Sequence, residues 1–251
     1  MNANAISSSG CGRNSATAIS MPDFARPYHR LVARVLQSLN ADLLATAECF
    51  FGGGTQLAMS LGEYRESRDV DFLCSSRLGF RLLREQVSAR SLGRIMRTPL
   101  PLARSVRADR DGIRTFVEVG AAHVKFEILL EARLDLAGRW ERDLGVSVLT
   151  ARHAVAEKLL ANADRGLDAS TLSRDLVDLA FLAAQVGRPV LREGLALAEN
   201  AYGDAVRRSL RRALDNFAQN RTRANACIRS LAVDDTAMLR KGLRVVRATL
   251  I

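Results

Sequence analysis

Residues 47–74 have the sequence AECFFGGGTQLAMSLGEYRESRDVDFLC. The apolar run that ends at Phe51 and the three glycines after it predict a strand followed by a tight turn. Apolar residues recur at helical spacing over 55–61, and Gly62 ends that pattern. Carboxylates and apolar residues alternate over 69–74, which is typical of a strand with one polar face. The stretch therefore predicts a strand, a glycine turn, a helix and a second strand, in that order.

The glycine turn and the second strand together indicate a site for a nucleotide. A glycine turn before a helix lets backbone N–H groups approach phosphate oxygens, so Gly53, Gly54 and Thr55 are expected to bind a triphosphate. Asp69 and Asp71 lie two residues apart on a strand, face the same side and can bind one hard divalent cation, which we expect to be Mg²⁺. Either feature alone is common in turns and at strand ends. Their combination across one short helix favours metal-dependent phosphoryl chemistry.

The first part of the chain predicts a tail and a mixed domain. Residues 1–21 are rich in Ser, Asn, Ala and Gly without periodicity, so we expect a disordered tail. Between 22 and 147, helical patterns such as the one over 79–91 mix with strand patterns over 103–131. This region is therefore predicted to be an α/β domain with a mixed sheet.

The second part of the chain, 148–251, predicts a helical bundle domain. Helical spacing begins at Thr150 and is broken at Gly187, close to a proline. The whole chain is thus expected to have an α+β fold. Four arginines lie along one side of the helix predicted over 202–219, where they are either a solvated face or a contact for a phosphate backbone: Arg207, Arg208, Arg211 and Arg212.

Composition narrows the function classes. The chain has 251 residues, 48% of them hydrophobic, and a net charge of +10. Only three of its 37 basic residues are lysines, and arginine forks suit phosphate groups, so a nucleic acid or nucleotide partner is favoured. Four scattered cysteines predict neither a zinc site nor a disulfide framework. With no apolar run long enough for a membrane span, we expect a cytoplasmic protein without a membrane partner, and Trp140 is expected in its core.

The helical half contributes further candidate residues. Lys158 lies in an otherwise apolar helix with no acid at position 154 or 162, so a phosphate contact is weighed against a snorkelling surface lysine. Asp175 and Asp178 share one helix face, where a structural pairing with Arg174 or Arg165 is weighed against a role in the site.

Three segments in this order resemble the AbiEii/AbiGii toxin group of the DNA polymerase β-like nucleotidyltransferase superfamily. The first motif is matched by 53–58 (GGTQLA), Gly62, Arg65, Ser67 and 69–72 (DVDF), the lysine motif by 156–161 (AEKLLA), and the RDxxD motif by 174–179 (RDLVDL). The resemblance spans residues 50–182.

The resemblance implies roles for particular residues. It places Asp69 and Asp71 as catalytic Mg²⁺ ligands, and Ser67 and Lys158 on the nucleotide. It also places Asp175 at the active site and leaves Asp178 structural. The superfamily often has a third carboxylate on a neighbouring strand, for which the best match is Glu127, a glutamate in place of the usual aspartate, with Glu118 as the alternative.

The resemblance also implies an activity. A Mg²⁺-dependent nucleotidyltransferase of this group would move a nucleoside monophosphate from an NTP to a hydroxyl, as in transfer to tRNA 3′ ends, and would act as the toxin beside a cognate antitoxin. One alternative is a small-molecule, antibiotic-type nucleotidyltransferase, against which the +10 charge argues because such acceptors are cationic. Another is a degenerate binding module, against which the presence of both aspartates argues. The nucleotide, the acceptor and the oligomeric state stay open.

Overall fold

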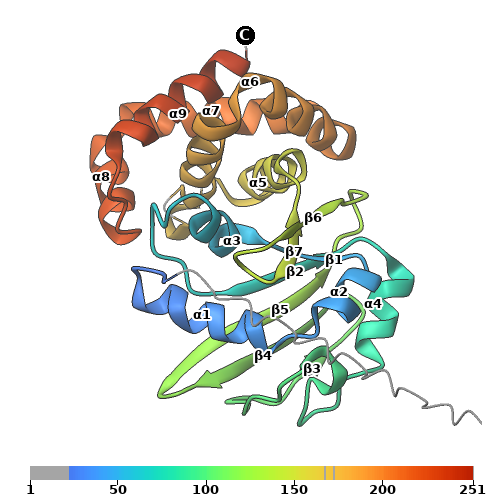
Figure 1. Ribbon diagram of the computed structural model, residues 1–251. Coiled ribbons are helices and arrows are strands. Elements are labelled where there is room, and N and C mark those ends of the chain that lie inside the picture. Colours follow the sequence, from blue (N-terminus) through green and yellow to red (C-terminus); the bar gives the residue numbers. More distant parts are fainter. Residues whose placement is uncertain (1–22, 167, 172, 251) are drawn as a thin grey trace, which may run out of the picture.

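The computed structural model describes residues 23–166, 168–171 and 173–250, so the tail predicted for 1–21 lies outside the described residues. A mixed sheet with helices on both of its faces forms the first half, and helices pack together above it to form the second (Figure 1). The predicted α+β fold is confirmed. None of the helices among the described residues is long and apolar enough to span a membrane.

Seven strands form one sheet with the order β3-β4-β5-β2-β1-β7-β6. The central strands carry the site: β1 runs antiparallel to β2, and β2 runs parallel to β5. The strands have these bounds: β1 Cys49–Gly52, β2 Val70–Cys74, β3 Arg107–Ala108, β4 Gly112–Val119, β5 Ala122–Leu130, β6 Gly138–Glu141 and β7 Val146–Leu149.

The two faces of the sheet have different roles. Phe51, Phe72 and Phe126 belong to the core cluster under one face, which the helices α1 (Pro27–Ser38), α2 (Ala41–Thr46) and α4 (Arg77–Arg84) also enter. Because side chains alternate along a strand, their neighbours Asp71 and Glu127 point to the other face. That face is covered by α3 (Gly53–Ser60) and by the helical half (Figure 1). The site residues therefore lie between the sheet and the helices.

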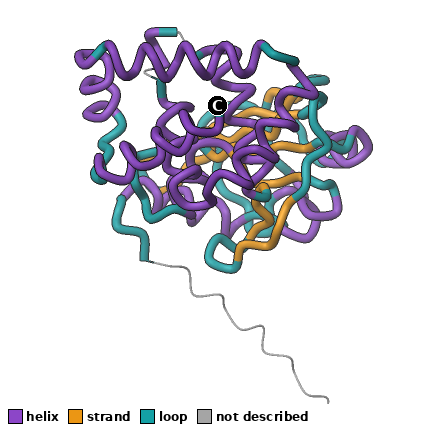
Figure 2. Tube along the Cα trace, turned by 90° about the horizontal axis from the view of Figure 1, so that it is seen from above, coloured by secondary structure: helices purple, strands orange, loops and turns teal. Residues whose placement is uncertain are grey.

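The helical half is built around α5 and α6. Its helices have these bounds: α5 Ala151–Arg165, α6 Arg174–Tyr202, α7 Ala205–Gln219, α8 Arg221–Ser230 and α9 Thr236–Thr249. Helix α6 packs most extensively against α5 and α9, and Figure 2 shows the helices gathered over the strands from above. The predicted break at Gly187 is present as a kink inside α6, where this residue has φ 75° and ψ −178°, a backbone conformation open to glycine.

Two expectations about local structure are wrong. The helix expected over 79–91 ends at Arg84, because the chain then turns back on itself and Ser88 and Ser91 exchange backbone hydrogen bonds of 2.9 and 3.2 Å. Trp140 is 51% exposed, since β6 is an edge strand that pairs only with β7. The sheet also continues past the expected domain boundary at 147, to the end of β7 at Leu149.

Candidate active site

The glycine turn joins β1 directly to α3 and brings its backbone against the carboxylate strand. Gly53 has φ 72°, and a Cβ atom built there would lie 2.7 Å from Oδ2 of Asp71. A Cβ atom at Gly54 would lie 2.0 Å from Nη2 of Arg65. Both positions therefore require glycine, one for its backbone conformation and both for close approach. As a result, the first backbone N–H groups of α3 lie beside Asp71.

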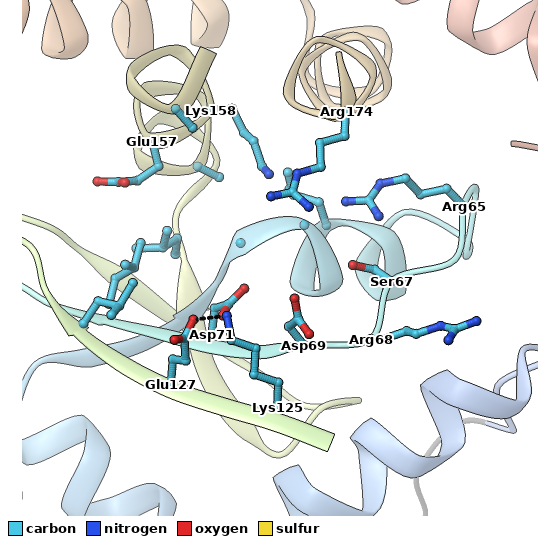
Figure 3. A pocket seen from close by; sticks show the side chains of 18 of the residues that line it. Arg65, Ser67, Arg68, Asp69, Asp71, Lys125, Glu127, Glu157, Lys158 and Arg174 are labelled. Carbon is cyan, nitrogen blue, oxygen red and sulfur yellow. Dashed lines mark hydrogen bonds and ion pairs between the residues drawn. The ribbon is translucent and has the colours of Figure 1, made fainter. Parts of the chain in front are cut away.

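The carboxylates meet at the centre of the sheet. Asp71 on β2 and Glu127 on β5 are directly paired across the two parallel strands, and Asp69 lies just before β2 (Figure 3). Burial raises the pKa of Asp71 to about 6, and the charges of Asp69 and Glu127 add to this effect. Glu118 lies opposite His123 near the hairpin turn between β4 and β5 and does not line the cavity, so the alternative third carboxylate is wrong.

Lys125 lies among these carboxylates, and the sequence analysis did not predict it as a site residue. Its Nζ is 2.5 Å from Oε2 of Glu127 (Figure 3). Partial burial lowers the pKa of Lys125, but Glu127, Asp69 and Asp71 outweigh burial and raise it overall. Because Lys125 precedes Glu127 by two residues on one strand, strand alternation was the signal that places both side chains on the same face.

The acidic side of the site suits a hard cation in its chemistry. Asp69, Asp71 and Glu127 offer only carboxylate oxygens, the donors that Mg²⁺ prefers. Across residues 23–166, 168–171 and 173–250, however, no three His, Cys, Asp or Glu side chains are already arranged around a common metal position. The ammonium group of Lys125 holds Glu127 in this arrangement.

Lys158 faces the carboxylates from α5, on the opposite wall of the cavity. It is only 6% exposed, and its Nζ lies 3.1 Å from Asp175 and 2.6 Å from Asp178. The interpretation of Lys158 as a snorkelling surface lysine is therefore wrong, because the side chain is buried. Its acidic partners lie on α6 and not on its own helix. Burial lowers the pKa of Lys158, but the two aspartates raise it overall, so the side chain stays charged.

The two aspartates of α6 lie behind the cavity wall. Asp175 accepts hydrogen bonds from Nε of Arg165 at 2.8 Å and from Lys158, and it does not line the cavity itself. Asp178 is fully buried and is bound by both Nε and Nη2 of Arg65, at 2.6 and 2.9 Å, and by the hydroxyl of Tyr64 at 2.7 Å. This network connects the loop before β2 to the helical half.

A second network orients the same loop from the other side. The backbone N–H of Ser67 donates to Nε2 of His29 at 3.3 Å, while Nδ1 of His29 lies 2.7 Å from Glu63. Burial lowers the pKa of His29, in keeping with a neutral ring that donates from Nδ1 and accepts at Nε2. The hydroxyl of Thr55 donates to that of Ser67 at 2.8 Å. Thr55 is buried and positions Ser67, while Ser67 lines the cavity.

These groups enclose one cavity of about 380 Å³. Its floor carries the carboxylates of the sheet together with Lys125, and its roof carries three cations beside the carboxyl group of Glu157. Lys158, Arg165 and Arg174 extend into the roof from the helical half, as Figure 3 shows for Lys158 and Arg174. The glycine turn lies between floor and roof. The cavity can therefore hold an anion and a cation next to each other.

A glycine turn before a helix, aspartates at the start of the adjoining strand and a lysine on a facing helix are the features expected of a nucleotidyltransferase. The chain belongs to the AbiEii nucleotidyl transferase toxin family of type IV toxin–antitoxin systems, whose family model matches residues 34–248. The resemblance seen in the sequence is thereby confirmed.

Solved structures show the same fold. A candidate nucleotidyltransferase from H. pylori is similar with a TM-score of 0.54 and 16% identity, covering 88% of this chain and 94% of that chain. JHP933 from Helicobacter pylori is similar with a TM-score of 0.54 and 16% identity, covering 92% of this chain and 94% of that chain. No curated protein sequence matches the chain.

Proposed function

We propose that the protein transfers a nucleoside monophosphate from an NTP to the 3′-terminal hydroxyl of a tRNA, with Mg²⁺ as cofactor. The observation that carries this proposal is the cavity in which the carboxylates of the sheet face Lys158, Arg165 and Arg174 across a glycine turn. Such a cavity separates the two needs of the reaction, because the triphosphate requires cations and N–H donors while the metal requires carboxylates.

Each part of the cavity has a role in this reaction. The N–H groups at Gly53 and Gly54 bind the triphosphate, and Lys158 and Arg165 balance its charge from the roof. Asp69, Asp71 and Glu127 would hold Mg²⁺, which stabilises charge on the leaving pyrophosphate when bound. Asp175 and Asp178 fix the position of Lys158 and are positioning residues. For Glu127 to hold the metal, its contact with Lys125 would have to open.

The net charge of the chain supports the proposed acceptor, and its family supports the proposed antitoxin partner. The net charge of +10 favours a polyanion such as tRNA over a cationic small molecule. Membership of a type IV toxin–antitoxin family supports a toxin whose action is countered by a cognate antitoxin.

The test is direct labelling. The purified protein is incubated with total tRNA, Mg²⁺ and each α-labelled NTP in turn, and we expect label on tRNA with at least one NTP. Adding EDTA, or replacing Asp69 by asparagine, should abolish the label while the circular dichroism spectrum stays unchanged. Label on a small cationic acceptor but not on RNA would contradict the tRNA proposal. No label on either would contradict the transfer reaction.

A further inference from the structure

The segment between α3 and β2 carries cavity residues but is neither helix nor strand. It covers residues 61–69 and brings Ser67 to the cavity wall (Figure 3). Its backbone groups therefore need partners from other parts of the chain. The backbone N–H of Glu66 donates to the carbonyl of Leu231 at 3.0 Å, and that of Ser67 donates to Nε2 of His29 at 3.3 Å. The position of Ser67 thus depends on a side chain of α1.

Glu63 holds the ring of His29 in place. It has φ 56°, a left-handed backbone conformation that is uncommon for residues other than glycine. Its carboxylate accepts hydrogen bonds from the backbone N–H groups of Ala25 at 2.7 Å and Arg26 at 3.0 Å, and it lies 2.7 Å from Nδ1 of His29. A glycine would suit the backbone at this position but would remove the carboxylate. Glu63 thereby joins the start of α1 to the segment that carries Ser67.

The ring of His29 is fixed as an acceptor toward Ser67. It is fully buried, and the ring of Phe24 meets it edge-on with the centroids 6.4 Å apart. Burial lowers the pKa of His29 against the opposing effect of Glu63, so the ring is neutral at neutral pH. A neutral imidazole has one N–H group, and because Nδ1 donates it to Glu63, Nε2 can only accept.

The contacts of Ser67 leave one group free for a ligand. Its backbone N–H is taken by His29, and its hydroxyl oxygen accepts a hydrogen bond from the hydroxyl of Thr55 at 2.8 Å. The Ser67 hydroxyl therefore keeps its own proton for the cavity that this residue lines. Phosphate oxygens accept hydrogen bonds and do not donate them, so this group suits a triphosphate.

We propose that His29 is a positioning residue for the triphosphate of the NTP, because its Nε2 fixes the backbone of Ser67 and so directs the Ser67 hydroxyl to a phosphate oxygen. The proposal rests on the proposed function and adds a residue to the same site. His29 does not line the cavity, so it acts through Ser67. The family model matches residues 34–248, and His29 lies outside the residues that it covers.

Two substitutions of the ring separate its two contacts. The amide of His29→Gln reaches the place of Nε2 and can accept from Ser67, whereas the amide of His29→Asn reaches only the place of Nδ1 and can contact Glu63. Affinities for NTP and for inorganic tripolyphosphate are measured with Mg²⁺ and without an acceptor. We expect His29→Asn to weaken binding of both ligands about tenfold, and His29→Gln to stay within about threefold of the unchanged protein.

The matched control is His153→Asn. It replaces another buried histidine, which lies on α5 and does not line the cavity. This variant should change neither affinity. Circular dichroism checks the fold of each variant. If His29→Asn does not fold, Glu63→Ala takes its place, because it keeps the ring and removes the partner that holds the proton on Nδ1.

A double-variant cycle shows whether His29 acts through Ser67. Ser67→Ala alone should weaken binding of both ligands about tenfold, because it removes the donated hydroxyl. Adding His29→Asn, or Glu63→Ala in its place, should then cost no more than about twofold further, since the hydroxyl that His29 directs is already absent. Two independent effects would instead multiply to about a hundredfold.

Three outcomes would overturn the assignment. The first is unchanged affinity in His29→Asn, or in Glu63→Ala where that variant replaces it. The second is an equal loss in His29→Asn and His29→Gln, which would show that only the packing of the ring matters. The third is a multiplied loss in the double variant, which would show that His29 acts independently of Ser67.

Failure of the proposed transfer is a different result. In that case the unchanged protein binds NTP but labels no acceptor, and the binding comparison still decides the role of His29. A protein that binds neither NTP nor tripolyphosphate would refute both proposals.

Discussion

At the scale of single residues, the carboxylates of the sheet are placed for function at the expense of stability. Asp71 is largely buried beside Asp69 and Glu127, and its pKa is raised from 3.8 to about 6. The charged form is thus disfavoured in the folded protein relative to the unfolded chain. This cost appears as the pH rises above 3.8 and is complete above about pH 6.

Asp71→Asn should therefore abolish transfer and yet stabilise the protein. In EDTA at pH 8 we expect its free energy of unfolding to exceed that of the unchanged protein by about 1 to 3 kcal/mol, because asparagine carries no charge to bury. The difference should shrink toward pH 4. Urea denaturation across this pH range measures it, with the exposed Asp143→Asn as the control. Equal or lower stability at pH 8 would contradict the electrostatic account of this site.

How far the sequence predicts single residues depends on whether their partners are local. The glycine run and the DxD spacing are short-range patterns, so the sequence alone indicates that Gly53, Asp69 and Asp71 lie close together, as they do in the cavity. The pairing of Arg65 with Asp178 joins residues 113 positions apart, so no spacing rule reveals it.

At the scale of elements, the pairing of β2 with β5 brings Asp71 opposite Glu127. Both strands were predicted from alternation, but their adjacency was not, because β3 and β4 intervene in the sequence and the neighbour of a strand is set by tertiary packing. Helix ends were similarly uncertain. The apolar spacing that predicted a helix up to residue 91 continues in an irregular segment that still packs on the core, as Val87 does.

Helix α7 gives a prediction about the acceptor. Arg207 on α7 is engaged by Glu199, while Arg208 and Arg212 are exposed one turn apart. Reversing both charges, Arg208→Glu with Arg212→Glu, should weaken tRNA binding about tenfold or more at low salt and flatten its salt dependence. NTP affinity should not change, because neither residue lines the NTP cavity.

The matched control for that double reversal lies on α9. Arg240→Glu with Arg244→Glu removes two exposed arginines at the same spacing and changes the net charge equally. Fluorescence anisotropy of labelled tRNA at several salt concentrations compares the two pairs. Equal losses for both pairs would show that only the total charge matters and that α7 is not the acceptor surface.

At the scale of the whole molecule, the two halves share a buried charge network. Arg65 and Tyr64 of the first half bind Asp178 of the second, and Lys158 joins the same group. Nearly all of it is shielded from water, so each charge depends on its partners. The halves should therefore unfold in one transition, which the single tryptophan in the first half and circular dichroism of the helices report separately.

Asp178→Ala tests this network. Removing one partner of a buried pair should cost about 3 to 5 kcal/mol of unfolding free energy, because Arg65 is left buried without its carboxylate. Asp215→Ala breaks an exposed pair with Arg247 and should cost about 1 kcal/mol or less. Urea denaturation followed by both probes measures the two variants. A similar cost for both, or separate transitions in the unchanged protein, would contradict the coupling.

The pairing of Arg65 with Asp178 also determines when the site is completed as the protein is synthesised. A ribosome makes the glycine turn and the aspartate strand long before it makes α6, yet the buried guanidinium of Arg65, in the loop between them, gains its carboxylate partner only when Asp178 arrives. The nascent chain therefore carries an incomplete site for as long as α6 remains inside the exit tunnel. Lys158 likewise lacks both of its aspartates until α6 has been made and packed, so the charged cavity is completed late in synthesis.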